Sequence, residues 1–151
     1  MEILEQITQF ITSATPGKCS PKLPTGLIVT GSGGTLHSTF FDQIQKSVTI
    51  AAETVFVLLT AAEAPNLKTL LRTVIKKCTS PNEDSEAEDE ALPRRRGPKL
   101  LNYDLHLLYD WCNDRHVQKV IVSFQDTEAF DAGLLTDSIM LFQYVPSPKP
   151  I

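Results

Sequence analysis

The stretch from Gly31 to Ser38 holds the residue types from which proteins build a phosphate-binding loop. Its sequence, GSGGTLHS, aligns with the pattern G-x-x-x-x-G-K-[ST], in which backbone amides surround a phosphate and a lysine reaches its outer oxygens. Leu36 replaces the second glycine of this pattern, and His37 replaces the lysine. The candidate nucleotide-site residues in this degenerate turn are Gly31, Gly33, Gly34, His37 and Ser38.

The two replacements weaken the chemistry of such a loop. The branched side chain of Leu36 obstructs the close backbone approach that a phosphate needs. His37 is mostly neutral near pH 7 and is shorter than lysine. The turn has two interpretations, residual nucleotide binding or a glycine-rich connection between a strand and a helix. We favour the second, because the charge used in phosphoryl transfer is missing.

A second candidate site lies in the segment from Phe124 to Glu128. An ATPase places Asp, usually followed by Glu, at the end of such a strand to hold Mg²⁺ and orient water. Gln125 and Asp126 occupy these positions here, so the pair is degenerate as well. The alternative is that Asp126 and Glu128 are turn and helix-start residues.

The cysteines and histidines form no further catalytic or metal-binding pattern. Cys19, Cys78 and Cys112 are far apart in the sequence and have no zinc spacing, which favours a reducing compartment. His106 and His116 have no cysteine or carboxylate at ligand spacing. The sequence therefore predicts no catalytic residue, no cofactor and no metal.

Three short apolar runs supply strands that could position the two candidate sites. They cover residues 26–31, 55–59 and 120–124, and each is apolar on both faces and rich in β-branched or aromatic residues. This composition is typical of parallel strands with both faces covered. The sequence therefore predicts an α/β fold with a parallel sheet of at least three strands.

Apolar residues at helical spacing lie before and between these runs, and again after the last one. They predict helices around residues 3–11, 40–48, 67–75, 101–112 and 134–142. Asn102 is the expected N-cap of the fourth helix. Helices alternating with strands predict layers on both faces of the sheet.

Charge is unevenly distributed along the chain. Six acidic residues lie between positions 83 and 90, and Arg94–Arg96 follow, so residues 80–99 are predicted to be a disordered surface insertion. The net charge of −4 gives no overall attraction to nucleic acid. No apolar run approaches the ~20 residues of a membrane span, and no signal peptide is recognisable, so no membrane association is expected.

Four segments, in order, resemble origin recognition complex subunit 3. They are LPTGLIVTG at residues 23–31, APNLKTLLR at 64–72, YDL at 103–105 and VSFQDTEAFDAGLL at 122–135. The family is similar to the AAA+ ATPases, so the resemblance implies a partial P-loop NTPase (AAA+-like) three-layer sandwich. It also implies no ATP hydrolysis, a nuclear location, and other origin recognition complex subunits as partners. Origin DNA is an expected partner of the complex, which binds replication origins and helps to load the replicative helicase.

The resemblance gives a division of the chain. Residues 1–22 are expected to form a helix and loop, 23–142 the partial AAA+-like domain, and 143–151 an atypical tail. Because the family's proteins are several times longer, we expect the chain to be a fragment or a truncated gene product. A divergent ATP-binding P-loop protein and a standalone protein-interaction module are the alternative functions.

Overall fold

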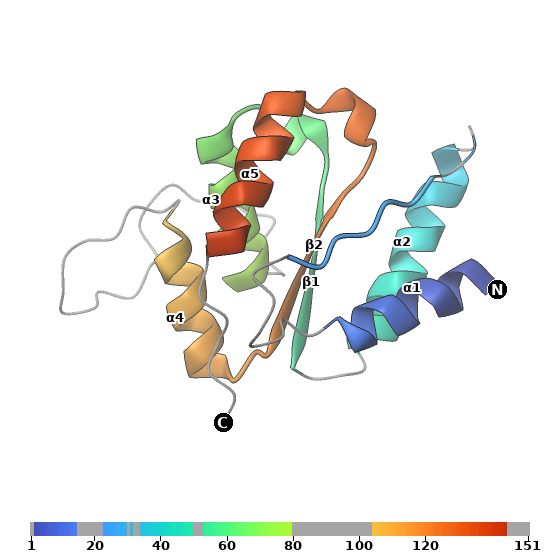
Figure 1. Cartoon of the computed structure of the whole chain (residues 1–151), viewed down its shortest axis with the longest axis horizontal. Helices are drawn as coiled ribbons and strands as arrows, with labels where there is room; N and C mark the ends of the chain where they lie inside the picture. The colour runs from blue at the N-terminus through green and yellow to red at the C-terminus, as the bar shows by residue number, and fades with distance from the viewer. Residues whose placement is uncertain are drawn as a thin grey trace.

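The computed structural model describes residues 2–14, 23–29, 31, 34–49, 53–79 and 104–144. These residues contain α-helices and a two-stranded parallel sheet, so the fold is α/β (Figure 1). The elements are α1 (Glu2–Ser13), α2 (Gly34–Thr49), β1 (Thr54–Leu59), the 3-10 helix η1 (Ala61–Glu63), α3 (Leu67–Thr79), α4 (Leu105–Arg115), β2 (Lys119–Phe124), the 3-10 helix η2 (Thr127–Ala129) and α5 (Ala132–Tyr144).

The parallel sheet confirms two of the predicted strands. β1 pairs with β2 in a register that runs from Thr54 opposite Lys119 to Leu59 opposite Phe124. Helices lie on both sides of these strands, with α1 and α2 on one side and α3, α4 and α5 on the other (Figure 1). Both α2 and α3 contact β1. This placement explains why the strands are apolar on both faces.

The prediction of a strand over residues 26–31 is wrong for the residues that the structure describes. Residues 23–29 form no strand, and their backbone pairs with neither β1 nor β2. Leu27 and Val29 are 81% and 87% exposed. A β-branched, apolar run forms a strand only where a neighbouring strand accepts its hydrogen bonds, and propensity alone does not supply that neighbour. The expected third strand is therefore absent from the described part of the chain.

The main hydrophobic core lies between the sheet and helices α3, α4 and α5. Its buried members come from β1, the end of η1, α3, α4 and the segments that flank β2. They are Val57, Leu59, Ala64, Leu70, Leu71, Val74, Ile75, Cys78, Leu108, Cys112, Val117 and Phe130. Trp111, which is partly buried, packs against this cluster. The core thus packs helices α3 and α4, which lie between β1 and β2 in the chain, against these two strands.

Local hydrogen bonds set where α3 and α4 begin. The Asn66 side chain accepts a hydrogen bond from the Thr69 amide at 2.9 Å, one turn into α3. Asp104 is the N-cap of α4 and accepts from the His106 amide at 2.9 Å. The expected cap, Asn102, lies outside the described residues, and the helix starts later than predicted. Each such cap contributes about 1 kcal/mol.

Helix α1 confirms the predicted N-terminal helix, but it is attached loosely. None of its residues is buried. The Lys119 ammonium donates to the carbonyl oxygen of Ile11 at 2.5 Å and to that of Thr12 at 3.4 Å, which holds the carboxyl end of α1. The ring of Phe10 lies so close to Gly26 that a Cβ there would come within 3.3 Å of it. These contacts fasten α1 near one end.

The remaining predicted features fall partly outside the described residues. The charged insertion 80–99 and Arg94–Arg96 lie there, as does most of the predicted tail. α5 extends through Tyr144, two residues past the boundary placed at 142.

Candidate functional site

The glycine-rich turn leads into the N-terminus of α2. Gly31 is exposed and Gly34 is the first residue of the helix, whereas Gly33 lies outside the described residues. His37 and Ser38 lie in the first two turns of α2. The beginning of α2 is at the same end of the molecule as the carboxyl ends of β1 and β2 (Figure 1). The turn therefore has the location of a ligand-binding loop in an α/β fold.

The end of β2 carries the second pair of candidate residues. The Gln125 amide donates to the Leu59 carbonyl at 2.9 Å, so it continues the pairing of β2 with β1. Asp126 follows with φ 52° and ψ 60°, in the left-handed region, and its carbonyl accepts from the Ala129 amide at 2.9 Å. Aspartate tolerates this conformation better than most residues. Asp126 thus forms the sharp turn between β2 and η2.

The end of β1 holds a polar network that sequence reasoning missed. The amide and hydroxyl of Thr60 donate to Glu63 Oε2 at 3.1 and 3.0 Å. The Lys77 ammonium donates to Glu63 Oε1 at 2.8 Å and to the Leu58 carbonyl at 2.7 Å. The T-x-x-E spacing from Thr60 to Glu63 is a capping-box signal that could have revealed part of it.

This network changes the acidity of the Glu63 carboxyl. Partial burial tends to raise its pKa, but hydrogen bonds from Lys77 and the Thr60 backbone, with the positive charge of Lys77, hold it below its usual value. Glu63 is therefore a carboxylate near neutral pH, with its oxygens engaged by neighbouring donors. Its role is to tie the end of β1 to α3.

Burial raises the pKa values of the two described cysteines. Cys78 and Cys112 are buried in the core. Burial, with a smaller contribution from the neighbouring Cys112, raises the pKa of Cys78 to about 12. Burial raises the pKa of Cys112 to about 11. Because the thiolate is the nucleophile, neither residue is activated for nucleophilic catalysis.

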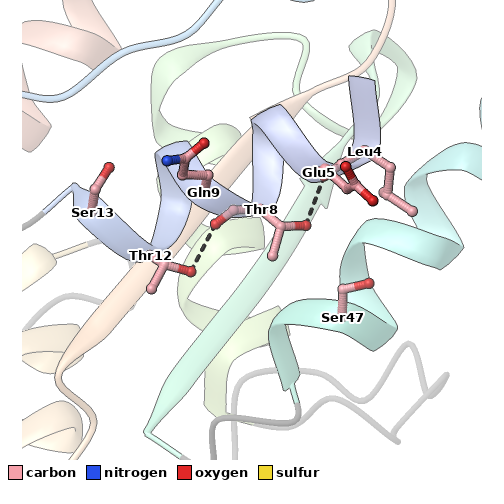
Figure 2. Close-up of a pocket in the computed structure, with 7 residues that line it drawn as sticks. All are labelled: Leu4, Glu5, Thr8, Gln9, Thr12, Ser13 and Ser47. Atoms are coloured by element: carbon pink, nitrogen blue, oxygen red, sulfur yellow. Dashed lines mark hydrogen bonds between the residues drawn. The ribbon is translucent and has the colours of Figure 1, made fainter. Parts of the chain in front are cut away.

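A shallow groove of about 530 Å³ lies between α1 and α2 (Figure 2). Leu4, Glu5, Thr8, Gln9, Thr12, Ser13 and Ser47 line it. Its hydroxyls bond within their own helices: Thr8 Oγ1 donates to the Leu4 carbonyl at 2.8 Å, and Thr12 Oγ1 donates to the Thr8 carbonyl at 2.7 Å. Among the described residues that line it there is no lysine, arginine or histidine, so these residues offer neither a general base of that kind nor a positive charge for phosphate.

The described residues contain no cluster of three or more metal-ligating side chains. In the same part of the chain, no helix has the length and apolar character needed to cross a bilayer. His106 is exposed, and His116 ends α4 with φ 56°. Of the predicted site residues, those that the structure describes lie at or just before the start of α2 and in the turn after β2, at the same end of the molecule (Figure 1).

One family comparison matches nearly the whole chain. The sequence model of the family described as "Origin recognition complex (ORC) subunit 3 N-terminus" matches residues 1–146. The match confirms the resemblance carried by the four segments and extends it to α1, the insertion and all of α5. Comparison with curated proteins and with solved structures gave no match.

Proposed function

The chain belongs to the family of origin recognition complex subunit 3 N-termini, and from this premise we propose that it is a non-catalytic subunit of that complex. In this role it contributes to the binding of replication origins and to helicase loading through the assembly, in the nucleus. The observation that carries the proposal is the family match over residues 1–146.

The degenerate turn supports the absence of ATP hydrolysis. Leu36 and His37 stand where a phosphate-binding loop has glycine and lysine, and Gln125 precedes Asp126 where an ATPase has an acidic pair. Asp126 serves a left-handed turn, and its backbone carbonyl is engaged by η2. Without the lysine, the charge that develops in phosphoryl transfer has no partner from this loop.

We also propose that the described elements are part of a larger AAA+-like three-layer domain. Residues 23–142 form it, with a disordered insertion at 80–99, preceded by a helix and loop at 1–22 and followed by a tail at 143–151. The helices on both sides of β1 and β2 support this arrangement, because parallel sheets need both faces covered (Figure 1).

The proposed partners are the other subunits of the complex, with origin DNA bound by the assembly. The net charge of −4 supports an indirect contribution to DNA binding, because phosphates are bound through lysine and arginine.

Co-purification tests the proposal. The endogenous protein is tagged, isolated gently from nuclear extract, and its companions and its own mass are determined by mass spectrometry. Co-purification with the other origin recognition subunits is expected. A solitary product of 16.7 kDa without these companions would contradict the subunit role.

The second candidate function is ATP binding without hydrolysis. It is favoured by one observation, the position of the glycine-rich turn at the N-terminus of α2, at the same end as the strand ends. ATP with Mg²⁺ would then raise the melting temperature, because a ligand that binds only the folded state stabilises it. We expect no shift beyond that given by Mg²⁺ alone.

A further inference from the structure

Helix α5 carries apolar residues both on the side that packs against the core and on the side that faces solvent. Leu134, Leu135 and Phe142 pack against the core, and the buried Ser138 hydroxyl donates to the Leu135 carbonyl at 2.8 Å. On the rest of its circumference, Ile139, Met140 and Leu141 are 38%, 50% and 36% exposed. A helix of this composition is usually covered all round, so the outer side of α5 lacks a partner in the described part of the chain.

A shallow depression of about 300 Å³ lies on this outer side. Asp137, Met140 and Leu141 line it, at positions i, i+3 and i+4 of one helical face, and Leu67 from the start of α3 completes it. Within the described residues, the Asp137 carboxylate makes no hydrogen bond or ion pair. The exposed Asp137 carboxylate thus lies beside three apolar side chains in one depression.

We propose that this depression, the α5 face, docks another subunit of the origin recognition complex. The partner presents an apolar side chain to Met140, Leu141 and Leu67, and an arginine or lysine to Asp137. The inference rests on the proposed function, which supplies the partner class. It adds the surface and the chemistry by which that partner is recognised.

The carboxylate selects the occupant. An unpaired carboxylate is costly to cover with an apolar surface alone, whereas a cation on the partner compensates its desolvation. Arginine suits this position because its planar guanidinium pairs with a carboxylate through two hydrogen bonds and its stem packs on apolar groups. A second copy of this chain is a poorer fit, since it carries the same net charge of −4 and presents the same carboxylate.

The test compares two substitutions of the same kind. The tagged chain is co-expressed with the remaining subunits of the complex, and the amount of each subunit retained is measured. Met140→Glu places a charge in the α5 face, and Ile3→Glu places one on the exposed side of α1, where Ile3 is 60% exposed. Met140→Glu is expected to reduce retention at least tenfold, because buried interface anchors dominate binding. Ile3→Glu is expected to leave retention unchanged.

Asp137→Arg provides a second variant at an exposed position. Repulsion from the partner's cation is expected to lower retention at least tenfold, with Asp137→Asn intermediate. Circular dichroism and melting temperature show whether each variant is folded. Failure of the unaltered chain to retain any subunit would overturn the proposed function. Normal retention by folded Met140→Glu and Asp137→Arg, while the unaltered chain assembles, would overturn the α5 face alone.

Discussion

Residues 2–49 and residues 53–144 use the same kinds of apolar segments with very different results. The second region closes a core around β1, α3, α4 and β2, and its cluster includes Leu59, Leu70 and Val74, all fully buried. In the first region, Ile44 and Val48 of α2 are buried, whereas α1 has no buried residue and Leu27 and Val29 face outward. Apolar residues are therefore buried only where other segments of the chain pack against them.

The parallel crossover in the second region explains why its apolar residues are buried and those of the first region are mostly not. β1, the crossover through α3 and α4, and β2 bring two strands into register and place the helices on them. Among the described residues of the first region there is no strand, so residues 26–29 have no neighbour in that region with which to pair. Five experiments test this contrast between the region with a closed core and the region attached to it.

The largest contrast is expected in thiol reactivity. At pH 8, iodoacetamide should alkylate Cys78 roughly a thousandfold and Cys112 roughly a hundredfold more slowly than an ordinary thiol, because little thiolate is present at pKa values of about 12 and 11. Peptide mapping by mass spectrometry, with and without denaturant, measures these rates. Both folded-state pKa values exceed the unfolded value of 9.0, so the stability they reflect is present below pH 9 and is lost as pH rises toward 11–12. Rapid labelling of the native protein would show that the second region is not closed.

The next effect is on the core itself. Leu70→Ala should lower the free energy of unfolding by about 2–5 kcal/mol, because the side chain is fully buried and leaves a cavity. Urea denaturation followed by circular dichroism measures the change. A loss below about 1 kcal/mol would contradict the prediction, because substitutions at the surface have effects of that size.

A smaller effect is expected at the edge of the core, where Glu63 and Lys77 join β1 to α3. Glu63→Gln should lower the free energy of unfolding at pH 7 by less than about 1 kcal/mol, since both side chains are over a third exposed, at 40% and 36%. The pKa of Glu63 is lowered in the folded state, so its contribution is present above the ordinary value of 4.5 and is lost as pH falls below it. The difference between Glu63→Gln and the unaltered protein should accordingly shrink between pH 7 and pH 3. A difference independent of pH would exclude an electrostatic role.

The smallest change in stability is expected in the first region. Ile3→Ala should alter the free energy of unfolding by no more than about 0.5 kcal/mol, because Ile3 is mostly exposed. Lys119→Met should instead speed hydrogen exchange in α1, with little effect on exchange in α3, since it removes the bonds to Ile11 and Thr12. Urea titration measures the first change and exchange mass spectrometry the second. Equal acceleration in both helices would show that α1 belongs to the same cooperative unit as the core.

The sequence predicted the elements whose signals are local. Continuous apolar runs predict β1 and β2, and apolar residues at helical spacing predict α3. Residues 26–31 carried the same signal as these strands, but pairing depends on a neighbour that the run itself does not specify. The N-cap of α4 is Asp104 and not the predicted Asn102. Both residue types are good N-caps, and propensity does not choose between them.

Sequence order indicated where polar residues lie along the chain, but it did not indicate which of them interact. The order strand, turn and helix placed Gln125 and Asp126 correctly at the end of β2. The partnership of Lys77 with Glu63 and the Leu58 carbonyl joins residues 14 and 19 positions apart, so only the folded crossover brings them together. The depression on α5 likewise depends on Leu67 from another helix.

The hydrogen bond from Lys119 to Ile11 joins residues 108 positions apart. It can therefore form only long after α1 has been synthesised. Synthesis at roughly 5–20 residues per second leaves α1 waiting about 5–20 s for the residue that fastens it. During that interval α1 can pack against α2, which it contacts, but it lacks the hydrogen bonds from Lys119. The hydrogen bonds that hold the carboxyl end of α1 are therefore completed only after β2 has been synthesised.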